Sequence, residues 1–315
     1  MNSEQFHIPS PLQKVALKEL EAKNIDLYIK RDDMIHPDVS GNKWRKLKFN
    51  IQQARFKGRN KIITFGGAHS NHIAATAKAA EIYGLESIGI IRGEDADFNN
   101  KTLSFARSCG MKLIAVSRSE YRNSDTWDYK ESLKQKFGNF YLIPQGGANF
   151  YGVNGCIEIM SEIEGELNPD ALFVPCGTAT TLSGMILGNK NQRKIFGVSA
   201  LKGGDFLMDD VRKNLMSVYS DKETVNYSLR NVSLLTDYHF GGFAKVNREL
   251  IAFIRNFYEQ TGIKLDPIYT SKTVFAMLEK VRAKHNKMPE KWVLIHTGGL
   301  QGIAAMEEKI GEKIY

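Results

Sequence analysis

Short apolar runs alternate with longer amphipathic stretches along most of the chain. Four apolar runs have the length and composition of buried parallel strands; they cover residues 62–65, 87–91, 112–116 and 140–143. Apolar residues at helical spacing lie between them, as in the stretch from Asn71 to Gly84, where glycine can end a helix. This alternation predicts a parallel sheet covered by helices on both faces.

A second series of the same kind follows, with apolar runs at residues 171–175, 194–198 and 291–296. The two series predict an α/β fold with two open, mostly parallel, twisted sheets flanked by helices. We expect a small domain of residues 50–160 and a larger domain that combines residues 1–49 with residues 161–315. Ligands of open α/β folds bind where strands end and helices begin, so functional residues are expected directly after strands.

The charge of the chain is basic but dispersed. Its 315 residues carry a formal charge of +8, from 43 Lys and Arg against 35 Asp and Glu. No nucleic-acid-binding motif accompanies these charges, so we expect no nucleic-acid partner. The sequence has neither an apolar signal-peptide core near its start nor a stretch long enough to span a membrane. Cys109, Cys156 and Cys176 are widely spaced and odd in number, which favours free thiols. We therefore expect a cytoplasmic protein without a membrane partner.

A cluster of cations precedes one amphipathic helix. Lys43, Arg45 and Lys46 lie in the segment SGNKWRKLKFN. Taken alone, such a cluster can be a solvated first turn of a helix. Positive charge is unfavourable at a helix N-terminus, however, so an anion is expected nearby. A lysine whose pKa is lowered by neighbouring cations can also become a Schiff-base nucleophile.

A turn with two glycines follows the run at residues 62–65. Ser70 can cap the next helix, and the N–H groups and side chains of Asn71 and His72 form a site for a carboxylate or phosphate. His69 and His72 have no acidic or thiol partner nearby in the sequence, so we expect no metal.

The segment PCGTATTLSG has the same position after a strand, and its amides and threonine hydroxyls can hold a phosphate. It matches neither the dinucleotide nor the Walker pattern, which argues against a nicotinamide-dependent oxidoreductase. Two later segments carry further polar groups: LDPIYTSK, with Tyr269 and Thr270 at a helix start, and HTGGLQG, where Gly298 and Gly299 allow close backbone approach.

Taken together, these segments resemble the 1-aminocyclopropane-1-carboxylate (ACC) deaminase/D-cysteine desulfhydrase family of fold-type II, tryptophan synthase β-like enzymes that use pyridoxal 5′-phosphate (PLP). The resemblance runs from IKRDD through GNKWRKL, GGAHSNH, GTATT and LDPIYTSK to HTGG, nearly the whole chain. It implies PLP in the cleft between the two domains, a small amino-acid substrate and a homodimer.

The resemblance also implies roles for particular residues. Lys43 matches the Schiff-base lysine, Lys46 a phosphate neighbour, and Asn71 a contact to the ring oxygen of the cofactor. The implied catalytic residues are Lys43, Ser70 and Tyr269. The implied substrate-binding residues are Ser70, Asn71, His72 and Tyr269. The remaining cofactor contacts are Gly177, Thr178, Ala179, Thr180 and Thr181 at the phosphate and Thr270 at the ring nitrogen.

Two threonines bear on the substrate. Thr270 and Thr297 stand where ACC deaminases of the family carry glutamate and leucine, as in the D-cysteine desulfhydrase branch. A threonine hydroxyl donates only to a neutral ring nitrogen, which makes a weaker electron sink that still suffices for elimination from Cβ. Phe243 replaces a tyrosine that is common in the family. We predict conversion of D-cysteine to pyruvate, hydrogen sulfide and ammonia; the alternatives are deamination of ACC or another small D-amino acid, and a non-catalytic PLP- or amino-acid-binding protein.

Overall fold

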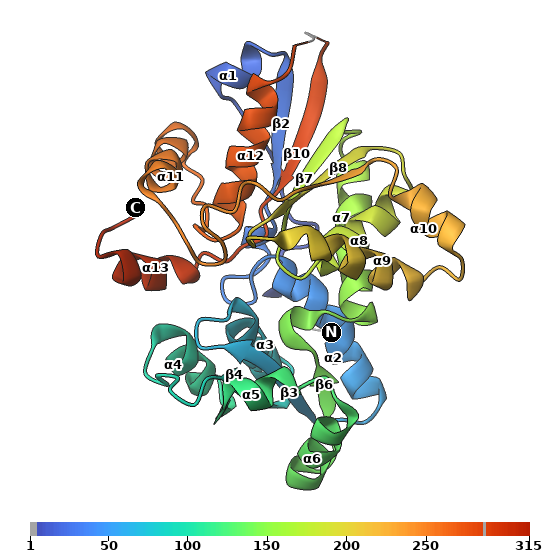
Figure 1. The fold of residues 1–315 in the computed structure, drawn as a ribbon, viewed down its shortest axis with the longest axis vertical. Coiled ribbons are helices and arrows are strands. Elements are labelled where there is room, and N and C mark those ends of the chain that lie inside the picture. The colour runs from blue at the N-terminus through green and yellow to red at the C-terminus, as the bar shows by residue number, and fades with distance from the viewer. Residues whose placement is uncertain (1–4, 286–287) are drawn as a thin grey trace.

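The computed structural model describes residues 5–285 and 288–315 and contains two separate sheets. The larger sheet has the strand order β1-β2-β10-β7-β8-β9. Its strands are β1 (Leu12–Val15), β2 (Ile25–Lys30), β7 (Ala171–Cys176), β8 (Lys194–Ser199), β9 (Val232–Leu235) and β10 (Glu290–Ile295). All neighbouring pairs are parallel except β1 with β2. Figure 1 shows this sheet in the upper part of the molecule.

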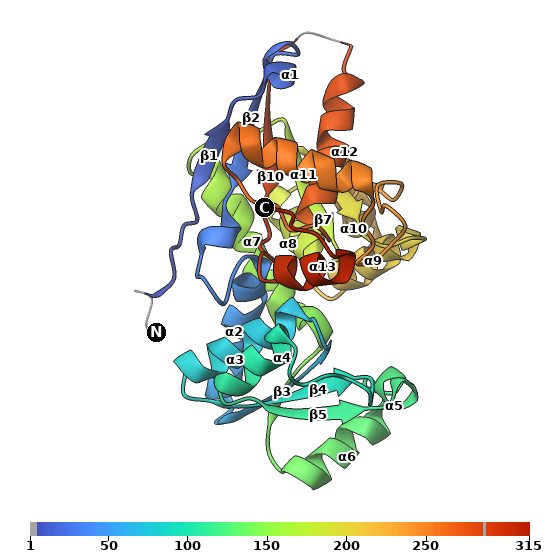
Figure 2. The same cartoon turned by 90° about the vertical axis from the view of Figure 1, so that its left-hand side faces the viewer.

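The smaller sheet is entirely parallel, with the order β5-β4-β3-β6. Its strands are β3 (Lys61–Gly67), β4 (Glu86–Arg92), β5 (Lys112–Val116) and β6 (Tyr141–Ile143). Figure 2 shows α3 and α4 on one side of this sheet and α6 on the other. The predicted α/β class with two mostly parallel sheets is confirmed.

The helices follow the strands in the expected alternation. They are α1 (Lys18–Glu21), α2 (Asn42–Phe56), α3 (Asn71–Ile82), α4 (Lys101–Ser108), α5 (Arg118–Arg122), α6 (Trp127–Phe137), α7 (Phe150–Glu164), α8 (Thr180–Asn189), α9 (Leu207–Met216), α10 (Lys222–Ser228), α11 (Arg248–Thr261), α12 (Thr270–Arg282) and α13 (Gly302–Ile310). The helix expected from Asn71 begins there and ends just before Gly84, which has a φ of 64°.

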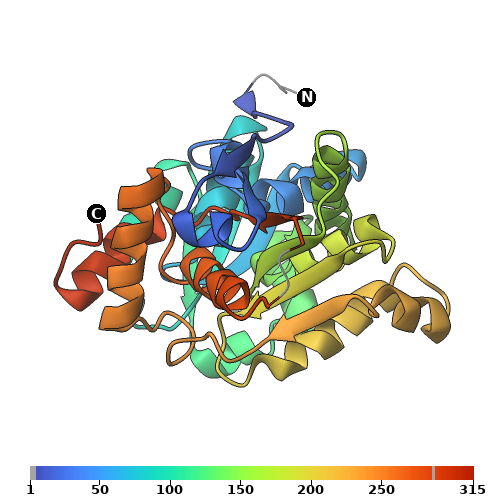
Figure 3. The same cartoon turned by 90° about the horizontal axis from the view of Figure 1, so that it is seen from above.

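Alternate residues of the central strands bury into two different cores, because successive side chains of a strand point to opposite faces. Leu172 and Val174 of β7 pack with α7, α8 and α9. Ala171 and Phe173 of the same strand pack with α12 and α11. Figure 3 shows the sheet from above, with helices on both sides of it.

Helices α2 and α7 carry the chain from one sheet to the other and back, and they pack closely. A Cβ on Gly155 of α7 would lie 1.8 Å from the carbonyl oxygen of Arg45 in α2, so only glycine permits this contact. All strands of the smaller sheet fall within residues 61–143. This supports a division into two domains, with limits at residues 49 and 160 that stay a proposal.

A buried network of four charged groups fixes α2 to the larger sheet. The Arg45 guanidinium bonds to Asp32 at 2.8 Å and to Glu162 of α7 at 2.8 Å. Lys30, at the end of β2, forms a second ion pair with Glu162 at 2.8 Å. The side chains of Arg45, Asp32 and Lys30 are fully buried and that of Glu162 is 11% exposed. Two cations thus balance two carboxylates beneath the segment that carries Lys43.

Candidate active site

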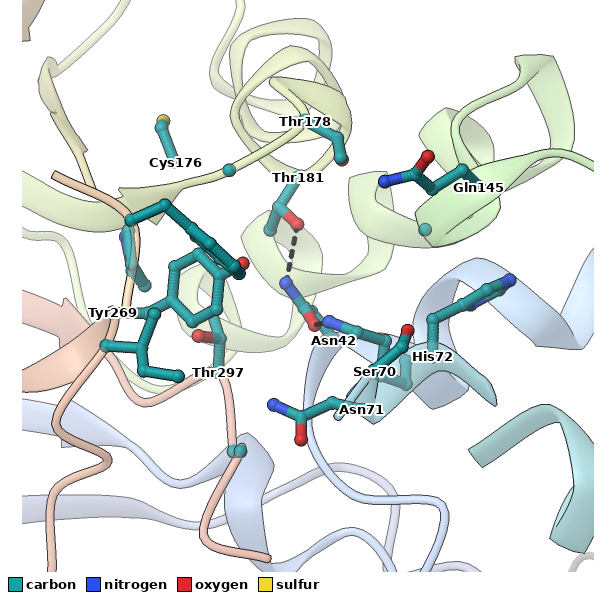
Figure 4. A pocket seen from close by; sticks show the side chains of 18 of the residues that line it. Asn42, Ser70, Asn71, His72, Gln145, Cys176, Thr178, Thr181, Tyr269 and Thr297 are labelled. Carbon is teal, nitrogen blue, oxygen red and sulfur yellow. Dashed lines mark hydrogen bonds between the residues drawn. The ribbon is translucent and has the colours of Figure 1, made fainter. Parts of the chain in front are cut away.

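A cavity of about 300 Å³ lies where strands of both sheets end. Of the residues predicted for the site, ten line its wall; they are Lys43, Lys46, Ser70, Asn71, His72, Gly177, Thr178, Ala179, Thr181 and Tyr269. The other two, Thr180 and Thr270, are fully buried and are not among the lining residues. Figure 4 shows side chains from the starts of α2, α3, α8 and α12 meeting around the cavity.

Lys43 is in the first turn of α2, and the N-cap of this helix is a glycine with a positive φ. Gly41 has a φ of 65°, and a Cβ there would lie 1.9 Å from the carbonyl oxygen of Thr297. Glycine therefore lets the helix start approach the loop after β10. Burial, helped by the nearby charge of Lys46, lowers the pKa of Lys43 to about 7. The amine is therefore substantially neutral and nucleophilic near physiological pH.

Asn42 links this lysine to the start of α8. Its side-chain oxygen accepts a hydrogen bond from Lys43 Nζ at 2.6 Å, and its Nδ2 donates to Thr181 Oγ1 at 3.0 Å (Figure 4). Sequence reasoning missed Asn42. Its position directly before the lysine in the GNKW segment is the signal that could have identified it.

The turn between β7 and α8 has the features of an anion site. Ala179, the N-cap of α8, has a left-handed φ of 53° and provides no side-chain cap to the helix. The Thr180 N–H donates to the main-chain oxygen of Thr178 at 2.6 Å, and the N–H groups that follow it in the first turn can bind an anion. Lys46 Nζ donates to Thr178 Oγ1 at 3.3 Å on the same turn. The Thr180 hydroxyl instead donates to the main-chain oxygen of Thr178, at 3.1 Å.

Close packing explains the glycine of this turn. A Cβ on Gly177 would lie 2.9 Å from the ring of Tyr269. Tyr269 itself is positioned by Asp266, whose carboxylate accepts hydrogen bonds from the N–H groups of Tyr269 and Thr270, each at 2.8 Å. Burial raises the pKa of Tyr269 above its usual value, so its hydroxyl keeps its proton at neutral pH.

The turn between β3 and α3 is the second candidate anion site. Ser70 caps α3, as expected, by accepting from the N–H of Ile73 at 3.4 Å. The His72 imidazole points away from Asn42 and Asn71 (Figure 4), and its Nε2 lies 2.8 Å from Thr64 Oγ1. Thr64 uses its only hydroxyl hydrogen on the main-chain oxygen of Ile143, so Nε2 must donate.

This tautomer leaves His72 Nδ1 as an acceptor. Burial, with smaller effects from Lys43 and Lys46, lowers the pKa of His72 to about 3, so the ring is neutral. A neutral ring with a free acceptor nitrogen cannot donate to a carboxylate. The expectation that the His72 side chain binds a carboxylate therefore gives way to a contribution from its main-chain N–H.

Other lining residues were not predicted as site residues. Arg92 ends β4, Gln145 follows β6, and Cys176 ends β7. The rule that ligands bind at the ends of strands could have identified all three. Phe243 also lines the cavity, with its ring centroid 6.0 Å from that of Tyr269.

Comparison with known proteins decides the family. The chain matches the family described as pyridoxal-phosphate-dependent enzymes over residues 4–298. The chain belongs to this family. This PLP-dependent enzyme is 31% identical, over 94% of its length and 78% of the relative, to the mitochondrial bifunctional D-cysteine desulfhydrase/ACC deaminase of Arabidopsis thaliana. It is 27% identical, over 89% of its length and 88% of the relative, to a D-cysteine desulfhydrase of Klebsiella pneumoniae.

A solved structure agrees with this assignment. The crystal structure of an ACC deaminase homologue covers 97% of the PLP-dependent enzyme and is covered to 94% itself, with a TM-score of 0.81 and 28% identity. The predicted membership of the ACC deaminase/D-cysteine desulfhydrase family and the predicted cofactor are thereby confirmed.

The cavity of the PLP-dependent enzyme fits its cofactor. Among the described residues that line it, Lys43, Lys46 and Arg92 are basic and none is acidic, which suits an anionic cofactor and an anionic substrate. The Thr270 hydroxyl is buried and has no hydrogen-bond partner in the described part of the chain. Buried polar groups are normally paired, so this hydroxyl fits a role toward a bound group.

No helix of the described residues is long and apolar enough to cross a membrane. Nor does the described chain bring together three or more His, Cys, Asp or Glu side chains that could hold a metal ion. Cys109, Cys156 and Cys176 are free thiols, as expected.

Proposed function

We propose that this PLP-dependent enzyme eliminates hydrogen sulfide from D-cysteine, and that water then hydrolyses the released aminoacrylate to pyruvate and ammonia. One observation carries the proposal: Lys43, with a pKa lowered to about 7, lines a cavity with two anion-binding helix starts. One helix start suits the cofactor phosphate and the other the substrate carboxylate. The distribution of charge thus matches a small amino acid bound beside PLP.

The residues would divide the work as follows. Lys43 holds the cofactor, Lys46 and the turn from Gly177 to Thr181 hold its phosphate, Asn71 contacts its ring oxygen and Thr270 its ring nitrogen. When bound, PLP supplies an electron sink that stabilises negative charge at the substrate Cα.

Proton transfer falls to three side chains. The substrate carboxylate docks at the start of α3, which orients the Cα–H bond. Lys43, or Ser70 beside it, takes the Cα proton. Tyr269 keeps its proton at neutral pH because burial raises its pKa, so its hydroxyl can donate that proton to the departing sulfur.

The choice of D-cysteine depends on Thr270. Its hydroxyl is buried without a partner among the described residues and can donate only to a neutral ring nitrogen. Such a nitrogen makes a weaker electron sink than a protonated one. Loss of a thiolate from Cβ requires less stabilisation of the carbanion than the opening of a cyclopropane ring, so elimination is favoured.

ACC deamination is the second candidate. The relative in Arabidopsis thaliana is named for both activities, at 31% identity. If the enzyme also opens ACC, the electron sink provided through Thr270 must suffice for a carbon–carbon bond. Activity on D-cysteine without activity on ACC would agree with a weak electron sink at Thr270, whereas activity on ACC would show that the sink is stronger.

The experiment is a direct product assay. The purified protein with PLP is supplied with D-cysteine, L-cysteine or ACC; sulfide and pyruvate report elimination, and 2-oxobutyrate reports ACC opening. We expect sulfide and pyruvate in equal amounts from D-cysteine and none from Lys43→Ala. Formation of 2-oxobutyrate alone would show that the substrate is ACC and not D-cysteine. Turnover retained in Lys43→Ala would refute the role of Lys43.

The assembly and compartment are proposed with the function. We propose a homodimer in the cytoplasm, by analogy with the fold type for the dimer. Sedimentation equilibrium of the purified protein tests the dimer, since a monomer of 35.5 kDa is readily distinguished from twice that mass.

A further inference from the structure

A loop with an unusual backbone closes one side of the cavity. Within residues 239–245, Phe240 and Ala244 have left-handed φ values of 49° and 53°, and the two glycines between them have φ values of 91° and 118°. Non-glycine residues rarely adopt such values. Phe243 and Ala244 of this loop, here called the cavity loop, line the cavity. Two turn hydrogen bonds lie within the loop, from Gly242 N–H to the His239 oxygen at 3.0 Å and from Lys245 N–H to the Gly242 oxygen at 3.2 Å.

A buried lysine holds it. Lys272 of α12 is fully buried, and its Nζ donates to the main-chain oxygens of His239 at 2.7 Å and Gly242 at 2.9 Å. Among the described residues, no carboxylate forms an ion pair with it. Burial lowers its pKa to about 8 while the Asp266 charge opposes that shift, so the ammonium remains protonated at neutral pH.

Burying a cation without a carboxylate partner is costly unless hydrogen bonds compensate. The compensation here comes from the two carbonyl groups of the cavity loop. We propose that Lys272 is a positioning residue that holds the cavity loop in place and thereby sets Phe243 against the substrate beside Tyr269.

The arrangement couples the loop to the chemistry. Tyr269 is the N-cap of α12 and Lys272 lies in the first turn of that helix, so one helix start carries both residues. The Phe243 ring packs on the Tyr269 ring at 6.0 Å and is 52% exposed. Lys272 therefore fixes the position of a hydrophobic side chain at the cavity mouth relative to the proposed proton donor.

Two weaker contacts assist. Lys309 Nζ donates to the main-chain oxygen of Ala244 at 2.7 Å in an exposed position. The Phe240 ring packs edge-on against Phe275 of α12, with 5.0 Å between centroids. Each of these contacts reaches one residue of the loop, whereas Lys272 bonds to two of its main-chain oxygens, at His239 and Gly242.

The test combines amide hydrogen exchange with kinetics on the holoenzyme. In Lys272→Met we expect the amides of residues 239–245 to exchange at least tenfold faster. Lys280→Met is the matched control because Lys280 lies on the same helix and does not line the cavity; its exchange should equal that of the wild type. Lys272→Gln, which retains an amide donor, should fall between the two.

Kinetics decide whether the lysine acts through Phe243. In Lys272→Met we expect KM for D-cysteine to rise about tenfold with kcat changed less than threefold, since the loop supplies no proton. Phe243→Ala should raise KM about as much as Lys272→Met does. The double variant that combines Lys272→Met with Phe243→Ala should have a KM no higher than that of Phe243→Ala alone. Additive effects on KM would overturn the proposed action through Phe243.

The hydrogen-exchange measurement does not depend on the identity of the substrate. The kinetic experiment rests on the proposed function, whereas amide exchange of the cavity loop needs no turnover. Faster exchange in Lys272→Met, with no sulfide produced by the wild type, would reject D-cysteine as the substrate but support the role of Lys272 in holding the loop. If Lys272→Met does not fold, Lys272→Gln carries the test. Loop exchange equal to that of the wild type in a folded variant at Lys272 would overturn the proposal.

Discussion

Replacement of Arg45 by methionine should destabilise the protein strongly, although Arg45 does not line the cavity. Methionine keeps most of the volume but removes the guanidinium that bonds to Asp32 and Glu162. Lys30 would then be the only cation facing two buried carboxylates in this network. Removing one partner of a buried charge network typically costs about 3–5 kcal/mol, because it leaves an uncompensated charge.

The expected change in melting temperature follows from chain length. The unfolding entropy is about 2.1 cal/mol/K per residue, so for 315 residues it is roughly 0.7 kcal/mol/K. A loss of about 3–5 kcal/mol should therefore lower Tm by roughly 5–8 °C. Scanning calorimetry at pH 7 measures this shift.

Arg282→Met provides the control, because Arg282 also contacts two carboxylates, Glu19 and Glu279, but is about half exposed. Exposed pairs contribute at most about 1 kcal/mol, so we expect a shift below about 2 °C. If Arg45→Met lowers Tm no more than Arg282→Met does, burial is not what makes the network important and the reasoning fails.

The pH dependence gives an independent check. Burial raises the pKa of Glu162, but its hydrogen bonds to Arg45 and Lys30 outweigh burial, and the net pKa lies below the usual 4.5. A carboxylate with a lowered pKa stabilises the fold above pH 4.5 and loses that effect as the pH falls through the folded-state pKa. The difference between wild type and Arg45→Met should therefore shrink in acid; a difference that grows in acid would contradict this sign.

Three further predictions concern the cavity. In protein stripped of its cofactor, the rate of PLP attachment should rise with pH through about 7, because only the neutral Lys43 amine is nucleophilic; stopped-flow absorbance measures it, and a midpoint near 10 would contradict the effect of burial. Tyr269→Phe should reduce kcat by about 10²–10⁴-fold with little change in Tm; an unchanged kcat would exclude Tyr269 as the proton donor. Thr270→Val should leave the stability of the cofactor-free protein unchanged or raise it by about 1 kcal/mol, yet slow turnover; a clear loss of stability would show that the hydroxyl already has a partner.

The apolar runs predicted strands β3 to β8 and β10, whereas β1, β2 and β9 were not predicted. The runs at residues 62–65 and 171–175 correspond to β3 and β7. Strand β2 was not predicted, because Ile25–Lys30 has charged residues at its second and last positions. Lys30 is buried there and pairs with Glu162, which lies 132 residues later in the chain. No local pattern records a partner so distant in the sequence.

The predicted site shows the same division. Ser70 was recognisable as a cap because its partner is three residues away. The orientation of the His72 ring depends on Thr64 and Ile143, which only the folded sheet brings together. The partners of Lys272 are carbonyl groups, which every residue possesses, so the sequence carries no sign of them.

The strand order has a consequence for synthesis on the ribosome. Strand β10 lies between β2 and β7 in the larger sheet, although it follows the other five strands in the chain. A nascent chain that has emerged only as far as β9 can pair the strands of the smaller sheet. The pair of β1 and β2 cannot yet be joined to β7, because β10, which lies between β2 and β7, has not been made. Domains fold as they are synthesised, N-terminal parts first, so here the first strands made are joined to their sheet by the last. Until β10 is made, the edges of β2 and β7 that will pair with it are exposed. A nascent-chain chaperone would therefore be most needed at these two edges.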